Sequence, residues 1–324
     1  MRHLISLFDI SQQELQTILS ISEQMKQLLE RGCRPPWLQR RVLALLFEKP
    51  SLRTRVSFEA GIQQLGGAAM FLGQEVGWKS RESTADFVRV LAQYADFIVC
   101  RAKSHESVLE LAKYNCVPII NGLTDLSHPC QALADVLTMQ QVCGSLAGKT
   151  VTFVGDGNNV ARSLCVAAAM VGMRFRLLGP AEYRISDDSI ATILKRYPNA
   201  DIVQNDAPNK MLAGADFVYT DVWTSMGQEA EATARRAAFA PFQVNCKLMA
   251  MASPNCRVLH CLPARRGEEI TDDVMDSRAS AVVEQAGNRM HAQKGLMVWL
   301  ALQQGWLDAV QLTNEGIQLP VGTS

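Results

Sequence analysis

Arginine and hydroxyl side chains follow an apolar run at the point where a helix is expected to begin. The letters EKPSLRTR directly follow the apolar segment 42–47 and contain Ser51, Arg53 and Thr54. A helix that starts after Pro50 would offer an anion its free backbone N–H groups, its positive dipole end and a fork-shaped guanidinium. These residue types at this spacing indicate a phosphate site. A capped helix with solvated arginines is the alternative interpretation.

Polar groups also follow other apolar segments. Arg101 follows the segment 96–100, and an arginine at the end of a strand usually serves an anion or a carboxylate, which favours the phosphate interpretation. Pro129 suits the first position of a helix, so His128 and Gln131 would look out from one helix end. By itself, a histidine at a helix start is more often a cap or surface residue than a catalyst.

The letters GDGNN follow the apolar segment 151–154 and invite comparison with a dinucleotide fingerprint. The third glycine position of G-x-G-x-x-G is Val160, which disfavours a nicotinamide site and an NAD-dependent dehydrogenase. Asn158 and Asn159 either form a turn or offer amides to a polar ligand.

These groups need a scaffold that brings distant residues together. Apolar runs of strand length alternate with amphipathic helical patterns, which predicts an α/β fold of two domains, each a mainly parallel sheet flanked by helices. A C-terminal helix is expected to pack back on the N-terminal domain. The predicted strands are 42–47, 96–100, 117–120, 151–154, 217–220 and 257–260. Because the carboxyl ends of parallel strands share one edge, the polar groups after them are expected to converge on one cleft.

The predicted domain boundary lies near 138–150, where a helix ends at Gly144 and a strand begins after Gly148. The expected divisions are the domains 1–140 and 150–284 and a C-terminal helix and tail at 285–324. Ser11, with Glu14 three residues on, predicts a capping box at the start of the first long helix.

Composition limits the possible partners. The chain has 324 residues, and its 32 basic and 32 acidic residues give no net charge. No overall electrostatic attraction therefore favours binding to nucleic acid or to an anionic membrane. Its nine cysteines form no C-x-x-C pair, which suits reduced thiols and argues against zinc. The apolar run near the N-terminus is too short for a signal peptide, and no segment reaches membrane-spanning length. We therefore expect a cytoplasmic protein.

Six ordered motifs resemble the aspartate/ornithine carbamoyltransferase family. They are FEKPSLRTRVSFEAG, HPCQALADVLT, GDGNNV, DVWTSMGQEAE, HCLPARRGEEITDDV and NRMHAQK, from Phe47 to Lys294. The resemblance implies an N-terminal domain that holds carbamoyl phosphate and a C-terminal domain that holds L-ornithine. The implied reaction carbamoylates the δ-amine and gives L-citrulline and phosphate, as in arginine biosynthesis, with no metal and no organic cofactor. The family also implies a homotrimer, or a multiple of trimers, with active sites near subunit boundaries.

The resemblance assigns roles to individual residues. The implied carbamoyl-phosphate ligands are Ser51, Leu52, Arg53, Thr54, Arg101, His128, Pro129, Cys130, Gln131, Cys261, the carbonyl of Leu262, and Arg289. The implied ornithine ligands are Asn159, Asp221, Ser225 and Met226. The implied catalytic residues are Arg53, Arg101, His128, Asp221 and Cys261. The alternatives are a buried core thiol for Cys261, a strand-end cap for Asp221 and core filling for Met226.

Two segments depart from the family pattern. Arg265 follows HCLPA, where a histidine, tyrosine or phenylalanine is expected. The segment GWKSRES carries Trp78 and Lys79, and the corresponding family loop can reach a neighbouring subunit's site. An N-acylated ornithine is therefore an alternative acceptor. A sensor on the same fold, which binds carbamoyl phosphate or an amino acid without turnover, is the alternative outside enzymes.

Overall fold

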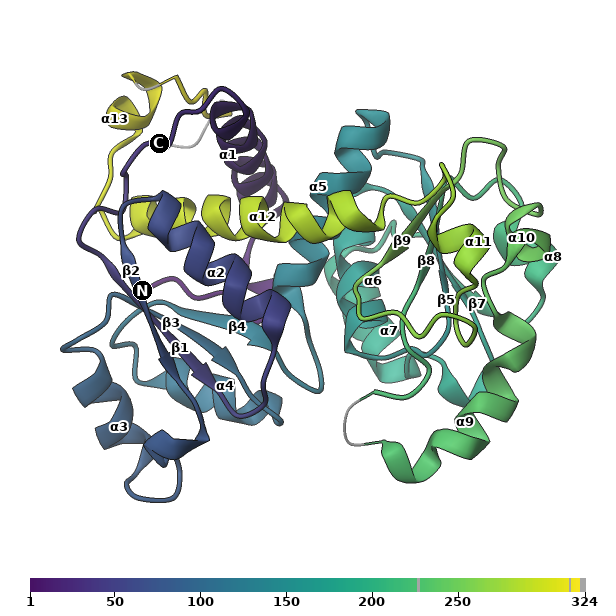
Figure 1. The fold of residues 1–324 in the computed structure, drawn as a ribbon, viewed down its shortest axis with the longest axis horizontal. Helices are drawn as coiled ribbons and strands as arrows, with labels where there is room; N and C mark the ends of the chain where they lie inside the picture. Colours follow the sequence, from purple (N-terminus) through teal and green to yellow (C-terminus); the bar gives the residue numbers. More distant parts are fainter. Residues whose placement is uncertain (226–227, 315, 321–324) are drawn as a thin grey trace. The chain divides into compact units, whose positions relative to one another are not determined.

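The computed structural model describes residues 1–225, 228–314 and 316–320, and it divides into two compact units (Figure 1). The first unit comprises Met1–Leu137 and Asn288–Ser324, and the second comprises Thr138–Gly287. The boundaries fall inside helices α5 (Pro129–Cys143) and α12 (Val282–Gln303). Each unit has its own parallel sheet flanked by helices, which confirms the predicted α/β fold class.

The sheet of the first unit has four parallel strands in the order β2-β1-β3-β4. Their bounds are β1 Val42–Phe47, β2 Ala68–Leu72, β3 Phe97–Arg101 and β4 Ile119–Leu123. Within the sheet, Leu45 pairs with Phe71 on one side and Val99 on the other. Every residue of β1 after Val42 is buried, as expected for a parallel strand covered on both faces.

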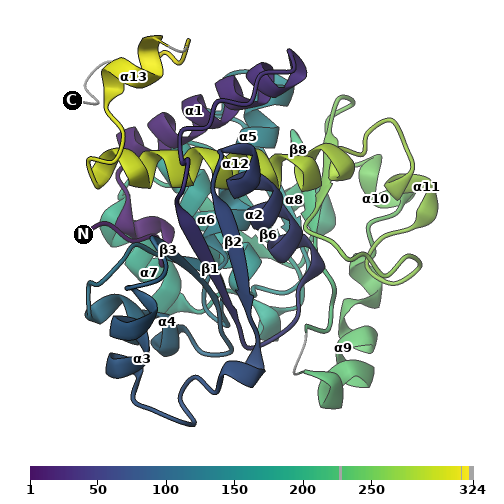
Figure 2. The same ribbon diagram turned by 60° about the vertical axis from the view of Figure 1, so that its left-hand side comes forward.

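The helices of the first unit cover both faces of this sheet (Figures 1 and 2). Besides α5 and α12, they are α1 Gln12–Glu30, α2 Leu52–Gln64, α3 Thr84–Leu91, α4 His105–Lys113 and α13 Ala309–Asn314. Phe87 of α3 and Leu111 of α4 share one apolar cluster with Leu46 of β1. The predicted capping box is confirmed, because Ser11 Oγ accepts the Glu14 N–H at 3.1 Å and Glu14 Oε2 accepts the Ser11 N–H at 2.7 Å.

The C-terminal helix α12 packs back on the N-terminal part of the chain, as expected. Lys294 Nζ donates to Gln64 Oε1 of α2 at 3.0 Å. A Cβ at Gly295 would lie 2.0 Å from Ser22 Oγ and 2.7 Å from the Ile18 carbonyl oxygen, both on α1. Only glycine therefore allows α1 and α12 to approach this closely.

The second unit contains five parallel strands in the order β7-β6-β5-β8-β9. The strands are β5 Thr150–Val154, β6 Arg174–Leu178, β7 Ile202–Asn205, β8 Phe217–Thr220 and β9 Arg257–His260. The helices are α6 Asn159–Val171, α7 Asp187–Arg196, α8 Pro208–Leu212, α9 Ala232–Phe239, α10 Cys246–Met249 and α11 Asp272–Met275. Leu212 of α8, Leu248 of α10 and Val274 of α11 pack in one cluster with Val154 and Val218 of the sheet.

Three strands, β2, β6 and β7, were not predicted from the sequence. β2 and β7 are edge strands whose residues are at most partly buried. β6 is interrupted by Arg174 and Arg176, and Arg176 Nη1 pairs with Asp201 Oδ1 at 2.7 Å. Such short segments carry a weak periodic signal.

Within the described residues, we find no helix with both the length and the apolar character needed to cross a bilayer.

Candidate functional site

The predicted phosphate loop forms the start of α2, directly beyond the carboxyl end of β1. Ser51 caps the helix, and its Oγ accepts the Thr54 N–H at 3.4 Å. The N–H groups of Leu52 and Arg53 have no partner within the helix, since they belong to its first turn. The Leu52 side chain is 74% exposed, so only its backbone suits a ligand role. This helix start therefore has the donors that an anion site requires.

Thr54 joins two arginines that come from distant parts of the chain. Its buried hydroxyl oxygen accepts hydrogen bonds from Arg101 Nη1 at 3.4 Å and Arg289 Nη2 at 3.2 Å. Burial, followed by the nearby cations Arg289 and Arg53, lowers the pKa of Arg101 to about 10. Cations held together in a desolvated place destabilise one another unless an anion compensates them. The cluster therefore suits a multiply charged anion.

His128 and Gln131 lie beside these arginines at the start of α5. Burial, with Arg289 and Arg101 as further causes, holds the pKa of His128 well below its ordinary value, so the imidazole is neutral near pH 7. Gln131 Oε1 accepts from Arg289 Nη1 at 2.6 Å, and its Nε2 donates to Asp135 Oδ1 at 2.8 Å. Both ends of the Gln131 amide are thus engaged, which determines its orientation.

Two other predicted ligands, Pro129 and Cys130, lie at this helix start. Pro129 is the first residue of α5, as predicted. Cys130 is fully buried, and its Sγ donates to the Asn121 carbonyl at 3.4 Å. Burial raises the pKa of its thiol to about 12. The Cys130 side chain is therefore a core thiol rather than a reactive one.

The second unit carries a cluster of a carboxylate, a thiol and an amide. Asp221 follows β8, and its Oδ1 accepts from Cys261 Sγ at 3.0 Å while its Oδ2 accepts from Asn158 Nδ2 at 2.9 Å. Cys261 follows β9, and Asn158 caps α6 by accepting the Val160 N–H at 2.9 Å. Side chains that follow β5, β8 and β9 therefore meet at one carboxylate, which is the convergence expected at strand ends.

His260 and Glu269 support Cys261 from the interior. Both side chains are fully buried, and His260 Nε2 lies 3.0 Å from Glu269 Oε1. His260 Nδ1 accepts the Leu262 N–H at 2.8 Å, so Nε2 carries the proton. Leu262 has φ 58°, in the left-handed region that leucine rarely adopts. The pair therefore holds the strained backbone next to Cys261 in place.

Asp221, His260 and Cys261 also form a possible set of metal ligands. One ligand atom of each lies within 4.8 Å of the others. However, both ring nitrogens of His260 are engaged, by the Leu262 N–H and by Glu269. In this arrangement the imidazole has no free lone pair for a metal ion, so the donor set does not fit one.

Both parts of the chain match models of known domains. Residues 2–141 match the carbamoyl-P binding domain of aspartate/ornithine carbamoyltransferase, and residues 147–300 match its Asp/Orn binding domain. The chain belongs to the aspartate/ornithine carbamoyltransferase family. Similar curated proteins are the ornithine carbamoyltransferases of Anoxybacillus flavithermus, 47% identical over 91% of this chain and 95% of the relative, and Bacillus subtilis, 45% identical over 91% and 92%. A solved ornithine carbamoyltransferase from Pyrococcus furiosus superimposes with a TM-score of 0.90, at 44% identity over 95% of this chain and 98% of that one.

Three further residues are predicted acceptor ligands of this carbamoyltransferase family member, namely Asn159, Ser225 and Met226. Asn159 is the first residue of α6, beside the Asn158 that contacts the carboxylate. The Ser225 N–H donates to Gln228 Oε1 at 3.0 Å. Met226 lies outside the described residues.

The GWKSRES segment, one of the two that depart from the family pattern, makes its contacts within its own chain. Trp78 stacks on Phe87, with ring centroids 6.2 Å apart. Lys79 Nζ pairs with Glu48 Oε1 at 3.1 Å, hydrogen-bonds Ser107 Oγ and lies 4.3 Å from the centroid of the Trp78 ring. A role for this loop in a neighbouring subunit's site stays a prediction.

Sequence reasoning missed four residues that support the second cluster. They are Asp156, Arg235, His260 and Glu269. All four lie in or beside the motifs that resemble the carbamoyltransferase family, but none occupies an implied ligand position. A spacing of nine residues in HCLPARRGEE was the only signal for the His260–Glu269 pair.

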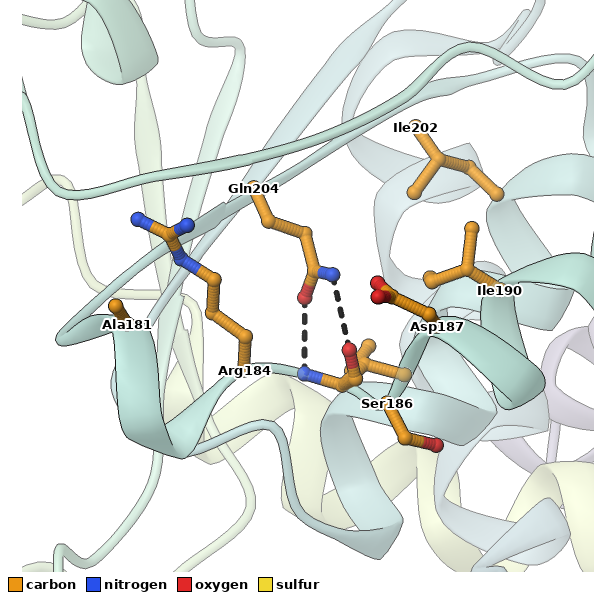
Figure 3. A pocket seen from close by; sticks show the side chains of 8 residues that line it. Ala181, Arg184, Ser186, Asp187, Ile190, Ile202 and Gln204 are labelled. Carbon is orange, nitrogen blue, oxygen red and sulfur yellow. Dashed lines mark hydrogen bonds between the residues drawn. The ribbon is translucent and has the colours of Figure 1, made fainter.

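A cavity of about 520 Å³ lies elsewhere in the second unit (Figure 3). The Gln204 amide beside it is engaged, because its Oε1 accepts the Ile185 N–H at 2.9 Å and its Nε2 donates to the Ile185 carbonyl at 3.0 Å. Its lining residues are Ala181, Arg184, Ile185, Ser186, Asp187, Ile190, Ile202 and Gln204. Since this set includes no predicted site residue, the cavity is separate from the candidate carbamoyltransferase site.

Proposed function

We propose that this chain transfers the carbamoyl group of carbamoyl phosphate to the δ-amine of L-ornithine, giving L-citrulline and phosphate. The observation that carries the proposal is the buried cluster of Arg101 and Arg289 on the Thr54 hydroxyl, at the start of α2. Family membership supports it, because ornithine carbamoyltransferases are similar to this chain over nearly its whole length.

In this proposal the first unit binds carbamoyl phosphate. Arg53, Arg101 and the first N–H groups of α2 hold the phosphate, while neutral His128 and Gln131 hold the carbamoyl group. As the amine attacks the carbonyl carbon, negative charge develops on the carbonyl oxygen and the departing phosphate. One preorganised donor contributes roughly 3 to 4 kcal/mol in comparable acyl-transfer sites.

The second unit binds the acceptor through Asp221, Asn159, Ser225 and Met226 in this proposal. A buried carboxylate matches a free α-ammonium, whereas an N-acylated ornithine would leave Asp221 facing an amide. Loss of such a match costs several kcal/mol, which corresponds to a discrimination of roughly a thousandfold. The proposed acceptor is therefore L-ornithine itself.

The δ-amine must react as its neutral form. With an ordinary pKa of about 10.4, an alkyl amine is neutral only about one time in a thousand near pH 7.4. We propose that Cys261 and Asp221 lie beside the reacting amine, where desolvation favours its loss of a proton. The chemistry needs no metal ion and no organic cofactor.

We further propose that the protein forms a homotrimer, or a multiple of trimers, and acts in the cytoplasm. The trimer rests on family membership. The compartment rests on the nine cysteines of the described chain, all of which are free thiols.

Citrulline formation by the purified protein tests the proposal. With saturating carbamoyl phosphate, we expect efficient turnover of L-ornithine, roughly a thousandfold lower kcat/KM for N-acetyl- and N-succinyl-L-ornithine, and almost none for putrescine or aspartate. Tight binding without any carbamoylated product would instead favour a sensor. A higher kcat/KM for either N-acyl compound would overturn the choice of acceptor and make Trp78 and Arg265 specificity residues.

A further inference from the structure

One buried guanidinium connects the two segments that supply Asn158 and Asp221. Arg235 of α9 is 6% exposed. Its Nη1 donates to Asp156 Oδ2 at 2.8 Å and to the Trp223 carbonyl at 3.2 Å. Asp156 belongs to the GDGNN segment after β5, and Trp223 belongs to the DVWTS segment after β8.

The position of this guanidinium is determined from three further directions. Arg235 Nε donates to Glu231 Oε2 at 3.0 Å, one turn earlier. Its Cζ lies 4.8 Å from the centroid of the Tyr183 ring. Tyr183 and Trp223 both pack on Phe239, with ring centroids 4.8 Å and 6.2 Å apart. A guanidinium placed this firmly can transmit its position to both segments.

The two segments are the ones that build the proposed acceptor site. Asp156 lies two residues before Asn158, and Trp223 lies two residues after Asp221. Asn158 and Asp221 are joined directly by the hydrogen bond between Nδ2 and Oδ2 at 2.9 Å. Arg235 therefore links the same two segments a second time.

The charge of Arg235 also matters to this arrangement. Burial and the nearby carboxylate of Asp221 raise the pKa of Asp156, while the pairing with Arg235 opposes that rise. Without the guanidinium, Asp156 would be a buried carboxylate close to a second one. Such a pair favours protonation or displacement of one member, and either change would disturb Asp221.

We propose that Arg235 is a positioning residue for the acceptor amino acid, which it never touches. It holds Asp156 and the Trp223 carbonyl so that Asn158 and Asp221 present one fixed face to the substrate. The inference rests on the proposed function. It predicts that substitution of Arg235 changes the KM for the acceptor but not the KM for carbamoyl phosphate.

Steady-state kinetics of Arg235→Gln, Arg235→Lys and Arg236→Gln test this inference, with each substrate varied in turn. Arg236 is the matched control, since it is the next residue of α9, with a half-exposed side chain that pairs with Glu268 at 3.2 Å. For Arg235→Gln we expect the KM for ornithine to rise at least about tenfold and the KM for carbamoyl phosphate to stay within about twofold. Arg235→Lys should recover part of the loss, because an ammonium can keep the Asp156 pair but lacks the Nε–H that holds the side chain on Glu231. Arg236→Gln should match the wild type.

Three results would overturn the inference. They are an unchanged KM for ornithine in a folded Arg235→Gln, equal rises in both KM values, or a lower melting temperature with a normal KM in both Arg235 variants. A wild-type protein that forms no citrulline would refute the proposed function, whatever the variants do. If Arg235→Gln does not fold, the same comparison is made on Arg235→Lys.

Discussion

At the scale of single residues, the first unit concentrates positive charge where a folded protein normally avoids it. Arg101 and Arg289 are 7% and 3% exposed, and both donate to the same Thr54 hydroxyl. In Arg101 the lowered pKa arises from burial first and from the two other arginines second. This arrangement costs stability in the absence of ligand, and a bound anion would recover that cost.

Substitution of Arg53 should weaken the use of carbamoyl phosphate while the protein still folds. In Arg53→Leu we expect kcat/KM for carbamoyl phosphate to fall roughly 100- to 1000-fold, because a charge-assisted donor to the phosphate is lost from a desolvated site. Steady-state citrulline assays measure the effect, and a thermal melt verifies that the variant folds.

Arg55→Leu is the matched control for this substitution. Arg55 lies two residues further along α2, and its half-exposed side chain pairs with Glu59 at 2.9 Å. Its loss should change kcat/KM by less than about twofold, since exposed pairs contribute little. Near-normal turnover in Arg53→Leu, or an equal loss in both variants, would contradict the phosphate assignment.

At the scale of elements, α12 combines close packing with buried polar side chains. The absence of a side chain at Gly295 allows its contact with α1, while the neighbouring Lys294 is 3% exposed and donates to Gln64 of α2. Burial, followed by the charge of Arg34, lowers the pKa of Lys294 to about 8. This interface therefore contains an ammonium that destabilises the fold at neutral pH.

The stability of the protein should rise with pH because Lys294 loses its proton in the folded state before it does so in the unfolded chain. Folded Lys294 loses its proton near pH 8, whereas the unfolded chain keeps it up to about 10.4, so unfolding takes up a proton between these values. From pH 7 to 9.5 the free energy of unfolding of the wild type should gain about 2 kcal/mol relative to Lys294→Met. Urea unfolding at both pH values measures the gain, and titrations shared by the two proteins cancel in the difference.

Lys113→Met serves as the control, because Lys113 is an exposed residue at the end of α4. It should show the same pH dependence as the wild type. If the free energy of unfolding of Lys294→Met changes between pH 7 and 9.5 as that of the wild type does, the prediction that burial lowers the pKa of Lys294 at this interface is refuted.

At the scale of the whole molecule, a neighbouring subunit is expected to complete each active site. Family membership favours a trimer, and the GWKSRES loop is the segment expected to reach a neighbour. In the single chain, Lys79 is held by Glu48, Ser107 and the Trp78 ring. A role in a neighbour's site would need these contacts to coexist with the ligand or to give way to it.

Mixing two inactive variants tests the shared site. If Lys79→Ala and Arg53→Leu are both inactive, their mixture after subunit exchange should recover up to about a quarter of wild-type activity. The active sites would be those that combine an intact Arg53 from one chain with an intact Lys79 from its neighbour. Citrulline formation is measured before and after exchange, with light scattering to establish the oligomeric state. An exchanged mixture that stays inactive would indicate that each site is contained in one chain.

The sequence by itself determined the parts of this protein that depend on near neighbours along the chain. The strands 42–47, 217–220 and 257–260 were predicted at their observed bounds, because their apolar runs are bounded by turn residues. The cap at Ser11 was also predicted, and the capped helix after Ser51 was the alternative interpretation there, since a cap acts on N–H groups within three residues of itself. Family motifs extended this local reading to candidate ligands.

Tertiary structure alone decided which of these residues touch. The Arg289–Thr54 hydrogen bond spans 235 positions, the Arg235–Asp156 bond spans 79, and Lys79 turned out to be engaged within its own chain. Local periodicity specifies which face of an element is buried. A side-chain hydrogen bond between two elements, however, requires the donor–acceptor distance to be correct to within a few tenths of an ångström. Those distances are set by how the helices and strands pack, and no pattern of neighbouring residues encodes them.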